Sequence, residues 1–397
     1  MIAYNSTTIF NSSLQKKAEL WYAKKLISEK QFSDISTNYS VNFYTPSIFV
    51  KIGLFIFTCF IILAALGIYA LLFASLFSGS SNGFAIFTCL AFAAICVTVL
   101  ESFIKSKNLY NAGVDEALLY AGIFFLGVAL YLFTDNLAGN SPLLFAFIAL
   151  PFITFSVLRY ADRIATLALC VCTYAVLFLL VMKFGAIAKL MMPFVLMLFS
   201  AVLYFQTKKL KHKLELAYWK SCIIVAEFVS LLVFYMACNY YVIRESSVLF
   251  FNMNLEEGQD IPLAFLFYIL TAVVPVAYIY FGLKRKDKVL LWSGLILLAA
   301  SVITFKYYFS LGHPEITLTI AGIILITVAS LAIKYLKVPR HGITFEEDRD
   351  ENSILKTNAE ALIIVESMAH KTETLPSQEG VEFGGGESGG AGSGGNY

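Results

Sequence analysis

One carboxylate, Glu227, lies well inside a long apolar run. It follows Lys220 by about seven residues, which places it about 10 Å into a membrane-spanning helix. Charged groups in hydrocarbon cost several kcal/mol, so an ionisable residue there is by default a functional-site hypothesis. Burial favours the protonated form of a carboxyl group, which suits proton coupling. The alternative is a neutral Glu227 that is hydrogen-bonded to a neighbouring helix. Asn239, further along the same run, is the second candidate for an intramembrane polar site; an interhelical hydrogen bond is the simpler interpretation, and a ligand role is the alternative.

A second group of charged residues lies at the ends of apolar runs. Asp115 and Glu116 open one run, where the helix dipole favours negative charge, and Lys105 and Lys107 can pair with them. Asp162 stands in a short basic turn and is expected to neutralise its arginine neighbours. Interfacial ion pairing is the simpler interpretation, and a cytosolic gate or an entrance for an anionic solute is the alternative. Six residues would form that gate: Glu101, Asp115, Glu116, Arg159, Asp162 and Arg163.

Motifs for enzymatic chemistry are missing from the sequence. It contains no Walker loop, no His-Glu-x-x-His and no Gly-x-Ser-x-Gly at a strand-to-helix turn. All 7 cysteines lie inside apolar runs without the spacing of a zinc site, so we interpret them as small buried hydrophobic residues. We therefore expect no catalytic residue, no metal and no cofactor, and we lean against an enzyme. The net charge of +2 gives no reason to expect a nucleic-acid partner.

The composition indicates which elements carry these residues. The chain has 397 residues, 59% of them hydrophobic and 14% charged, with a mean hydropathy of +0.75. Soluble proteins have about 45–50% apolar and about 25% charged residues, so the lipid bilayer is the expected surrounding. Backbone groups in lipid must be paired within a segment, so spanning segments are helices. We predict an all-α polytopic bundle over 48–337. Ten stretches are long enough to cross about 30 Å of hydrocarbon: about 50–77, 84–104, 117–134, 143–158, 164–182, 187–206, 221–243, 261–283, 289–307 and 316–336.

The distribution of basic residues predicts the orientation of the bundle. Alternate connecting segments carry 13 Lys and Arg, whereas the segments between them carry 4. Because cytoplasmic loops of membrane proteins are enriched in Lys and Arg, the basic connections are expected in the cytoplasm. Ten spans then place both termini on that side of the membrane.

Two segments are expected outside the membrane. Residues 1–47 read as two short helices forming a cytosolic hairpin, with Ser28 and Gln31 as a capping box. Residues 338–397 turn acidic, with 11 Asp and Glu against 4 Lys and Arg, and end in Gly/Ser-rich sequence that is expected to be disordered. Either segment is a candidate contact for a cytosolic protein, and the oligomeric state does not follow from the sequence.

A resemblance to a known family rests on the N-terminal segment. The sequence Trp21-Tyr-Ala-Lys-Lys-Leu-Ile-Ser-Glu29 resembles a family of uncharacterised bacterial inner-membrane proteins with an N-terminal cytosolic helical pair of the W-x-x-x-x-L-I-S type. Asn111-Ala-Gly-Val-Asp-Glu-Ala-Leu-Leu-Tyr120 and the glycine-rich tail are also similar to such proteins. The resemblance implies a bacterial plasma membrane location and implies no activity.

Two classes of function are left open. The first is a non-enzymatic membrane protein that acts through partners, in assembly or regulation. The alternative is a transporter for a small solute or ion, with a proton-coupling Glu227 in the seventh span. In that case Pro275 is expected to kink or break the eighth span, because proline frees a backbone carbonyl and broken helices often hold transported ions.

Overall fold

The part of the chain that the structure describes is helical. The computed structural model describes residues 2–308, apart from positions 24, 42, 45, 74–81, 140, 212, 214–217 and 252–259, together with positions 322, 323, 326, 330 and 334. Within these residues the named elements are twelve helices, and β pairing is limited to an isolated bridge between Tyr44 and Leu109. The expected tail and nearly all of the expected tenth span lie outside the described residues.

The N-terminal segment forms a helical hairpin of α1 (Ser6–Ala23) and α2 (Glu29–Asn38). Ser28 and Gln31 form the predicted capping box: Ser28 Oγ accepts from the Gln31 N–H at 3.3 Å, and Gln31 Oε1 accepts from the Ser28 N–H at 2.8 Å. The side-chain amide of Gln15 joins the helices by donating to the Tyr39 carbonyl at 2.8 Å. Little of the hairpin is buried, since Ala18 is the core residue of α1 and no residue of α2 is buried.

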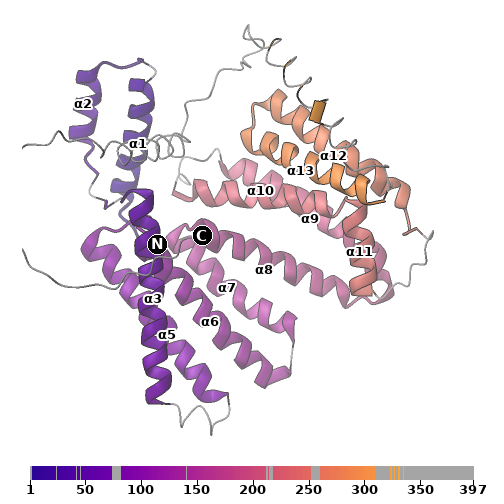
Figure 1. Ribbon diagram of the computed structural model, residues 1–397, viewed down its shortest axis with the longest axis horizontal. Helices are drawn as coiled ribbons and strands as arrows, with labels where there is room; N and C mark the ends of the chain where they lie inside the picture. Colours follow the sequence, from indigo (N-terminus) through magenta and orange to yellow (C-terminus); the bar gives the residue numbers. More distant parts are fainter. Residues whose placement is uncertain are drawn as a thin grey trace, which may run out of the picture. The chain divides into compact units, whose positions relative to one another are not determined.

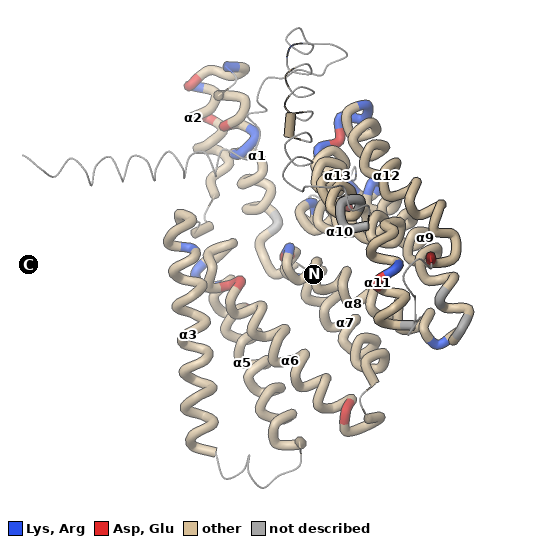
Figure 2. Tube along the Cα trace, turned by 45° about the vertical axis from the view of Figure 1, so that its right-hand side comes forward, with Lys and Arg blue, Asp and Glu red and all other residues tan. Residues whose placement is uncertain are grey.

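Long apolar helices follow the hairpin. Seven helices in the described residues are long and apolar enough to cross a membrane, which is compatible with a multi-pass membrane protein. Figure 2 shows long uncharged stretches along α3, α5, α6 and α7. Ten named helices follow the hairpin, and these seven are among them: α3 (Ile48–Leu72), α5 (Gly83–Lys107), α6 (Val114–Ala138), α7 (Pro142–Tyr160), α8 (Arg163–Met182), α9 (Ala186–Lys211), α10 (Lys220–Met236), α11 (Tyr240–Phe251), α12 (Ala264–Arg285) and α13 (Lys288–Tyr308).

These helices occupy nine of the ten stretches expected from the sequence. The seven spanning helices are α3, α5, α6, α7, α8, α12 and most of α9. The pair α10 and α11 counts as one further span if it crosses as a unit, and α13 contains a shorter apolar helix, Lys288–Thr304. Ten spans therefore stay a prediction.

Neighbouring helices pack as antiparallel hairpins. The closest pairs are α5 with α6, α7 with α8, α9 with α10, and α12 with α13, while α3 packs on α6 (Figure 1). The connections within these hairpins include the basic segments of the sequence. Contacts join the connecting turns of neighbouring hairpins to one another and to the N-terminal segment. The Tyr4 ring packs against the rings of Tyr110 and Tyr218, and the Trp219 indole donates to the Leu158 carbonyl at 3.2 Å. We call this side, with turns 108–113, 161–162, 218–219 and 286–287, the basic end.

The expected seventh span, 221–243, is bent near its C-terminal end. Helices α10 and α11 meet at an angle of 77° across residues 237–239. The sequence predicts a kink or a break at Pro275, and the break is wrong because α12 continues through Pro275. Proline at this position cannot donate to the Thr271 carbonyl, and the Ser301 hydroxyl of α13 donates to that oxygen instead, at 2.9 Å. The freed carbonyl is therefore satisfied without a break.

Candidate functional site, a buried cluster of paired charges

Four charged side chains meet between α9, α10 and the turn that joins α12 to α13. Lys208 and Lys211 lie in the last turn of α9, Glu227 on α10, and Asp287 in the turn. Glu227 is completely buried and the Asp287 side chain is 5% exposed, whereas the two lysines keep 24% and 22% exposure. The cluster carries two positive and two negative formal charges and is mostly enclosed by protein.

Each lysine faces both carboxylates. Lys211 Nζ donates to Glu227 Oε2 at 3.0 Å and lies 3.9 Å from Asp287 Oδ1. Lys208 Nζ donates to Asp287 Oδ2 and lies 3.3 Å from Glu227 Oε1, too poorly aligned for a hydrogen bond. The cluster therefore joins the α9–α10 hairpin to the α12–α13 hairpin by charge. Removing one member would leave an uncompensated charge in a buried place.

The sequence located Glu227 but not its partners. The apolar run 187–206 predicts that Lys208 and Lys211 follow the sixth span in a basic connecting segment, whereas α9 continues to Lys211. This extra helix turns the two lysines toward α10. Asp287 stands between Lys286 and Lys288 in a basic segment, so the sequence gives no sign that it meets Glu227; the tight turn after α12 brings it to the cluster.

The electrostatics of Asp287 follow from this arrangement. Burial raises the pKa of its carboxyl group, but the hydrogen bond from Lys208 and the charges of Lys208 and Lys211 outweigh burial. The pKa therefore lies below its usual range, and Asp287 stays ionised. Lys208 also lies 5.7 Å from the centre of the Tyr204 ring, whose hydroxyl is buried with no hydrogen-bond partner among the described residues. That oxygen borders the cluster on the α9 side.

Asn239 lies at the bend between α10 and α11 and bonds to another helix. Its amide nitrogen donates to Thr304 Oγ1 of α13 at 2.9 Å and to Tyr235 Oη at 2.9 Å. Its carbonyl oxygen accepts from the Val242 N–H at 3.3 Å. The next N–H, of Tyr240, donates to Thr271 Oγ1 of α12 at 3.0 Å. Side chains from α12 and α13 thus satisfy backbone and amide groups where the helix is interrupted.

Glu101 and Arg159, two of the charged residues expected at helix ends, pair with each other across α5 and α7. Arg159 Nε donates to Glu101 Oε1 at 2.5 Å, and the Tyr160 hydroxyl donates to the same oxygen at 2.8 Å. Glu116 pairs with Lys51 of α3 at 2.7 Å, rather than with the expected Lys105 or Lys107.

The remaining carboxylates at this end, Asp115 and Asp162, accept hydrogen bonds from backbone N–H groups. Asp115 accepts from the N–H groups of Asn111 and Ala112, both at 2.9 Å, and thereby closes the turn before α6. Asp162 caps α8 by accepting from the Ala165 N–H at 2.8 Å, and it accepts from the Tyr120 hydroxyl at 3.0 Å. Among the described contacts Asp162 forms no ion pair with its arginine neighbours: Arg159 binds Glu101, and Arg163 is exposed.

The N-terminal residues cover part of this group. The Ala3 N–H and the Tyr218 hydroxyl both donate to the Arg159 carbonyl, at 3.0 and 3.1 Å. The Tyr4 hydroxyl lies 3.5 Å from Asp115 Oδ2. Burial, followed by the Asp115 charge, raises the pKa of Tyr4 far above its usual range, so its phenol stays protonated and donates. Five of the six charged residues named for a gate are therefore engaged in local contacts, and Arg163 is exposed.

The cluster between α9, α10 and α12 is the stronger candidate site. It contains a completely buried carboxylate, and its charges come from two helical hairpins, with Asp287 lying 79 residues along the chain from Lys208. Among the described residues, no group of three or more His, Cys, Asp or Glu is placed to hold a metal ion. No family model, curated protein or solved structure matches the chain.

Proposed function

We propose that this chain is an integral membrane protein that carries a small solute or ion, with the cluster of Lys208, Lys211, Glu227 and Asp287 as its proton-coupling site. The observation that supports the proposal is the wholly buried Glu227 carboxylate facing two lysines from another helix. Ionisable groups held within a spanning bundle mark proton relays and ion pathways.

The charge balance of the cluster gives a mechanism for coupling. With both carboxylates ionised, the two lysines are matched. A proton that binds Glu227 removes one negative charge and leaves a net positive charge that is largely buried, which is unfavourable unless it is compensated. An anion that enters with the proton, or an opening that admits water to Lys208 and Lys211, would compensate it. Proton uptake is thereby tied to solute binding or to movement.

The bend in the seventh span supports the same proposal. Interrupted helices in transporters line the substrate path, and the two halves can move separately. Here α10 carries Glu227 near the basic end and the interruption at 237–239 further along. A change of charge at Glu227 thus acts on α10, which can move relative to α11 at the bend between them. The proposal also includes ten spans, a bacterial plasma membrane and both termini in the cytoplasm.

Proton flux into liposomes tests the role of Glu227. The full chain is reconstituted with a pH-sensitive dye inside, and flux is measured for wild type, Glu227→Gln and the control Glu19→Gln, an exposed position on α1. We expect Glu227→Gln to abolish protein-dependent flux and Glu19→Gln to keep it. Thermal unfolding of each variant is recorded in parallel, so that loss of folded protein is separated from loss of flux. Unchanged flux in folded Glu227→Gln protein would remove the residue from the proposal.

A second candidate function is binding of a cytosolic partner through the N-terminal hairpin. Its observation is the exposure of large apolar side chains on a hairpin with little core: Phe10 is 60% exposed and Leu26 69%. A photoreactive residue at position 10, with one at the exposed Lys16 of the same helix as control, tests it in cells. Protein adducts specific to position 10 are expected. Lipid adducts alone would show that the hairpin lies on the membrane surface instead.

A further inference from the structure

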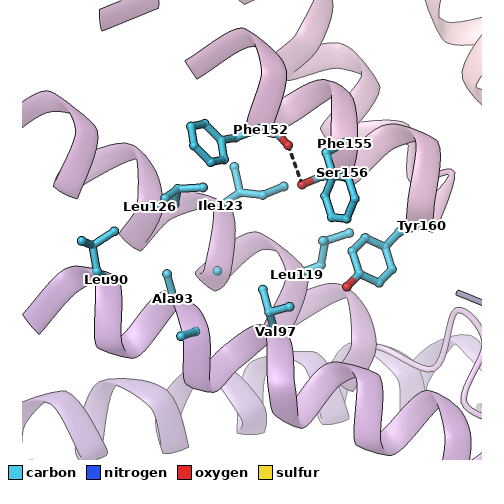
Figure 3. Close-up of a pocket in the computed structure, with 12 residues that line it drawn as sticks. Leu90, Ala93, Val97, Leu119, Ile123, Leu126, Phe152, Phe155, Ser156 and Tyr160 are labelled. Atoms are coloured by element: carbon cyan, nitrogen blue, oxygen red, sulfur yellow. Dashed lines mark hydrogen bonds between the residues drawn. The ribbon is translucent and has the colours of Figure 1, made fainter. Parts of the chain in front are cut away.

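An apolar groove of about 300 Å³ lies between α5, α6 and α7. Figure 3 shows side chains from all three helices facing it, with Leu90 and Leu126 toward one end and Tyr160 at the other. Small residues, Ala93, Ala94 and Gly122, line it and give room between the helices. The groove belongs to the first half of the bundle and is separate from the charge cluster.

The groove is open on the side that faces hydrocarbon. Four large apolar residues line it and are exposed: Val97 at 40%, Leu90 and Phe152 at 44% each, and Phe155 at 60%. In a bilayer such residues contact lipid tails. The groove is thus a recess in the lipid-facing surface of the protein.

The groove, together with the turn of α5 that follows it, corresponds in length to one leaflet. Along α5 it runs from Leu90 to Val97, and the next turn on the same face brings Glu101. Leu90 to Glu101 spans about 16 Å at about 1.5 Å per residue. Half of a hydrocarbon core about 30 Å thick is about 15 Å. A chain lying in the groove would therefore reach from the middle of the bilayer to the headgroup layer at the basic end.

The end of the groove at the headgroup layer is polar and mainly positive. Tyr160 lines the groove and bonds to Glu101, which also holds Arg159. The bond to Glu101 uses one of the five N–H donors of the guanidinium, and the Arg159 side chain is 25% exposed. Lys105 lies one turn beyond Glu101 on α5 and is exposed, and Lys107 ends the helix. On α5 and α7, three positive side chains thus stand against the single carboxylate of Glu101, while Glu116 is paired with Lys51 and Asp115 and Asp162 bond to backbone N–H groups.

We propose that this groove is a binding site for an anionic glycerophospholipid of the leaflet at the basic end. One acyl chain lies between α5, α6 and α7, and the phosphate contacts Arg159 and Lys105. The fit of the groove to one leaflet selects an acyl chain, and the positive end selects an anionic headgroup. The site rests on the membrane placement of the helices and does not depend on transport.

Competition between two lipids with the same acyl chains tests the headgroup. The full chain in a neutral detergent is titrated with phosphatidylglycerol or phosphatidylcholine, and bound lipid is counted by native mass spectrometry. A basic residue near a lipid surface contributes a preference of about fivefold for anionic headgroups, so phosphatidylglycerol should bind at least about fivefold more tightly. Equal binding of the two lipids to the wild type would overturn the proposal.

Variants of groove and headgroup residues locate the bound lipid. Ala94→Phe fills the groove from an exposed rim position and should remove the preferred lipid, whereas Ala65→Phe, at an exposed position on α3, should keep it. Lys105→Gln should weaken binding of phosphatidylglycerol several-fold and binding of phosphatidylcholine less, because the choline cation already offsets the phosphate charge of that lipid. Circular dichroism and lipid-free unfolding show that each variant is folded. Retained lipid binding in folded Ala94→Phe would show that a lipid does not occupy the groove. The same conclusion would follow if Ala94→Phe converted dimers of the chain to monomers and left lipid binding intact, because a second copy of the chain would then fill the groove.

Discussion

Gly113, just before α6, lies directly against the backbone of Lys51 on α3. A Cβ atom at Gly113 would meet the Lys51 carbonyl oxygen at 2.2 Å, and the residue has a φ of 93°, where side chains are disfavoured. The side chain of Lys51 binds Glu116 one turn into α6. The contact of α3 with α6 therefore depends on a glycine at one position and an ion pair beside it.

Gly113→Ala is expected to destabilise the protein, because strain at this φ alone costs of order 1–3 kcal/mol and the contact with Lys51 adds to it. Gly127→Ala in the same helix is the matched control, since no atom lies within 4 Å of its added Cβ. Thermal unfolding in detergent should show a lower midpoint for the first variant and an unchanged or higher one for the second. Equal midpoints would show that α3 can move away from Gly113 without cost.

The long helices were predictable from the sequence because apolar runs of this length have few alternatives in lipid. The described spans begin and end within a few residues of the apolar runs at most positions, as for α8, which spans 163–182 against the expected 164–182. The capping box was predictable as well, because Ser28 and Gln31 are three residues apart and the motif is local. Periodicity and local spacing carry this information.

The candidate site could be predicted only in part, because its partners come from distant segments. Glu227 stood out as a charge in an apolar run, but its lysines lie beyond the end of another such run. The bend at 237–239 has no Pro or Gly to announce it, and it depends on hydrogen bonds from Asn239 to Thr304 and from Tyr240 to Thr271. Local sequence patterns do not show which side chains of different helices will meet.

Asp287 gives an expected dependence of stability on pH. Its pKa is lowered in the folded protein, because the Lys208 hydrogen bond and the lysine charges outweigh burial. Its contribution is therefore complete above the usual aspartate pKa of about 3.9 and is lost as the pH falls toward the folded value. The difference in unfolding midpoint between wild type and Asp287→Asn should be constant from about pH 8 to 5 and shrink below about pH 4. Asp34→Asn on the exposed face of α2 is the control, and a gap independent of pH would contradict the assignment.

Substitutions of Asp162 can distinguish its role as a helix cap from a role in charge neutralisation. Its carboxylate accepts from the Ala165 N–H at the start of α8 and from the Tyr120 hydroxyl. Asp162→Ala removes both bonds, and loss of the cap alone costs about 0.5–2 kcal/mol, whereas Asp162→Asn keeps an oxygen that can cap. Chemical denaturation should therefore rank the stabilities as wild type, then Asn, then Ala. If Asn and Ala were equally destabilised, the charge of Asp162 would matter more than its cap.

Ser301 and Pro275 act on the same carbonyl group, and a double-mutant cycle can test this. Pro275 cannot donate to the Thr271 carbonyl, and the Ser301 hydroxyl donates to it across the interface between α12 and α13. Ser301→Ala leaves that buried oxygen without its donor, which costs about 1–3 kcal/mol. In a Pro275→Ala background, the alanine N–H can bond to Thr271 within α12, so Ser301→Ala should cost much less. The coupling between the two substitutions, measured by equilibrium unfolding, should then be about 1 kcal/mol or more. Additive effects would mean that Ser301 contributes through packing on α12 and not through the carbonyl that proline leaves free.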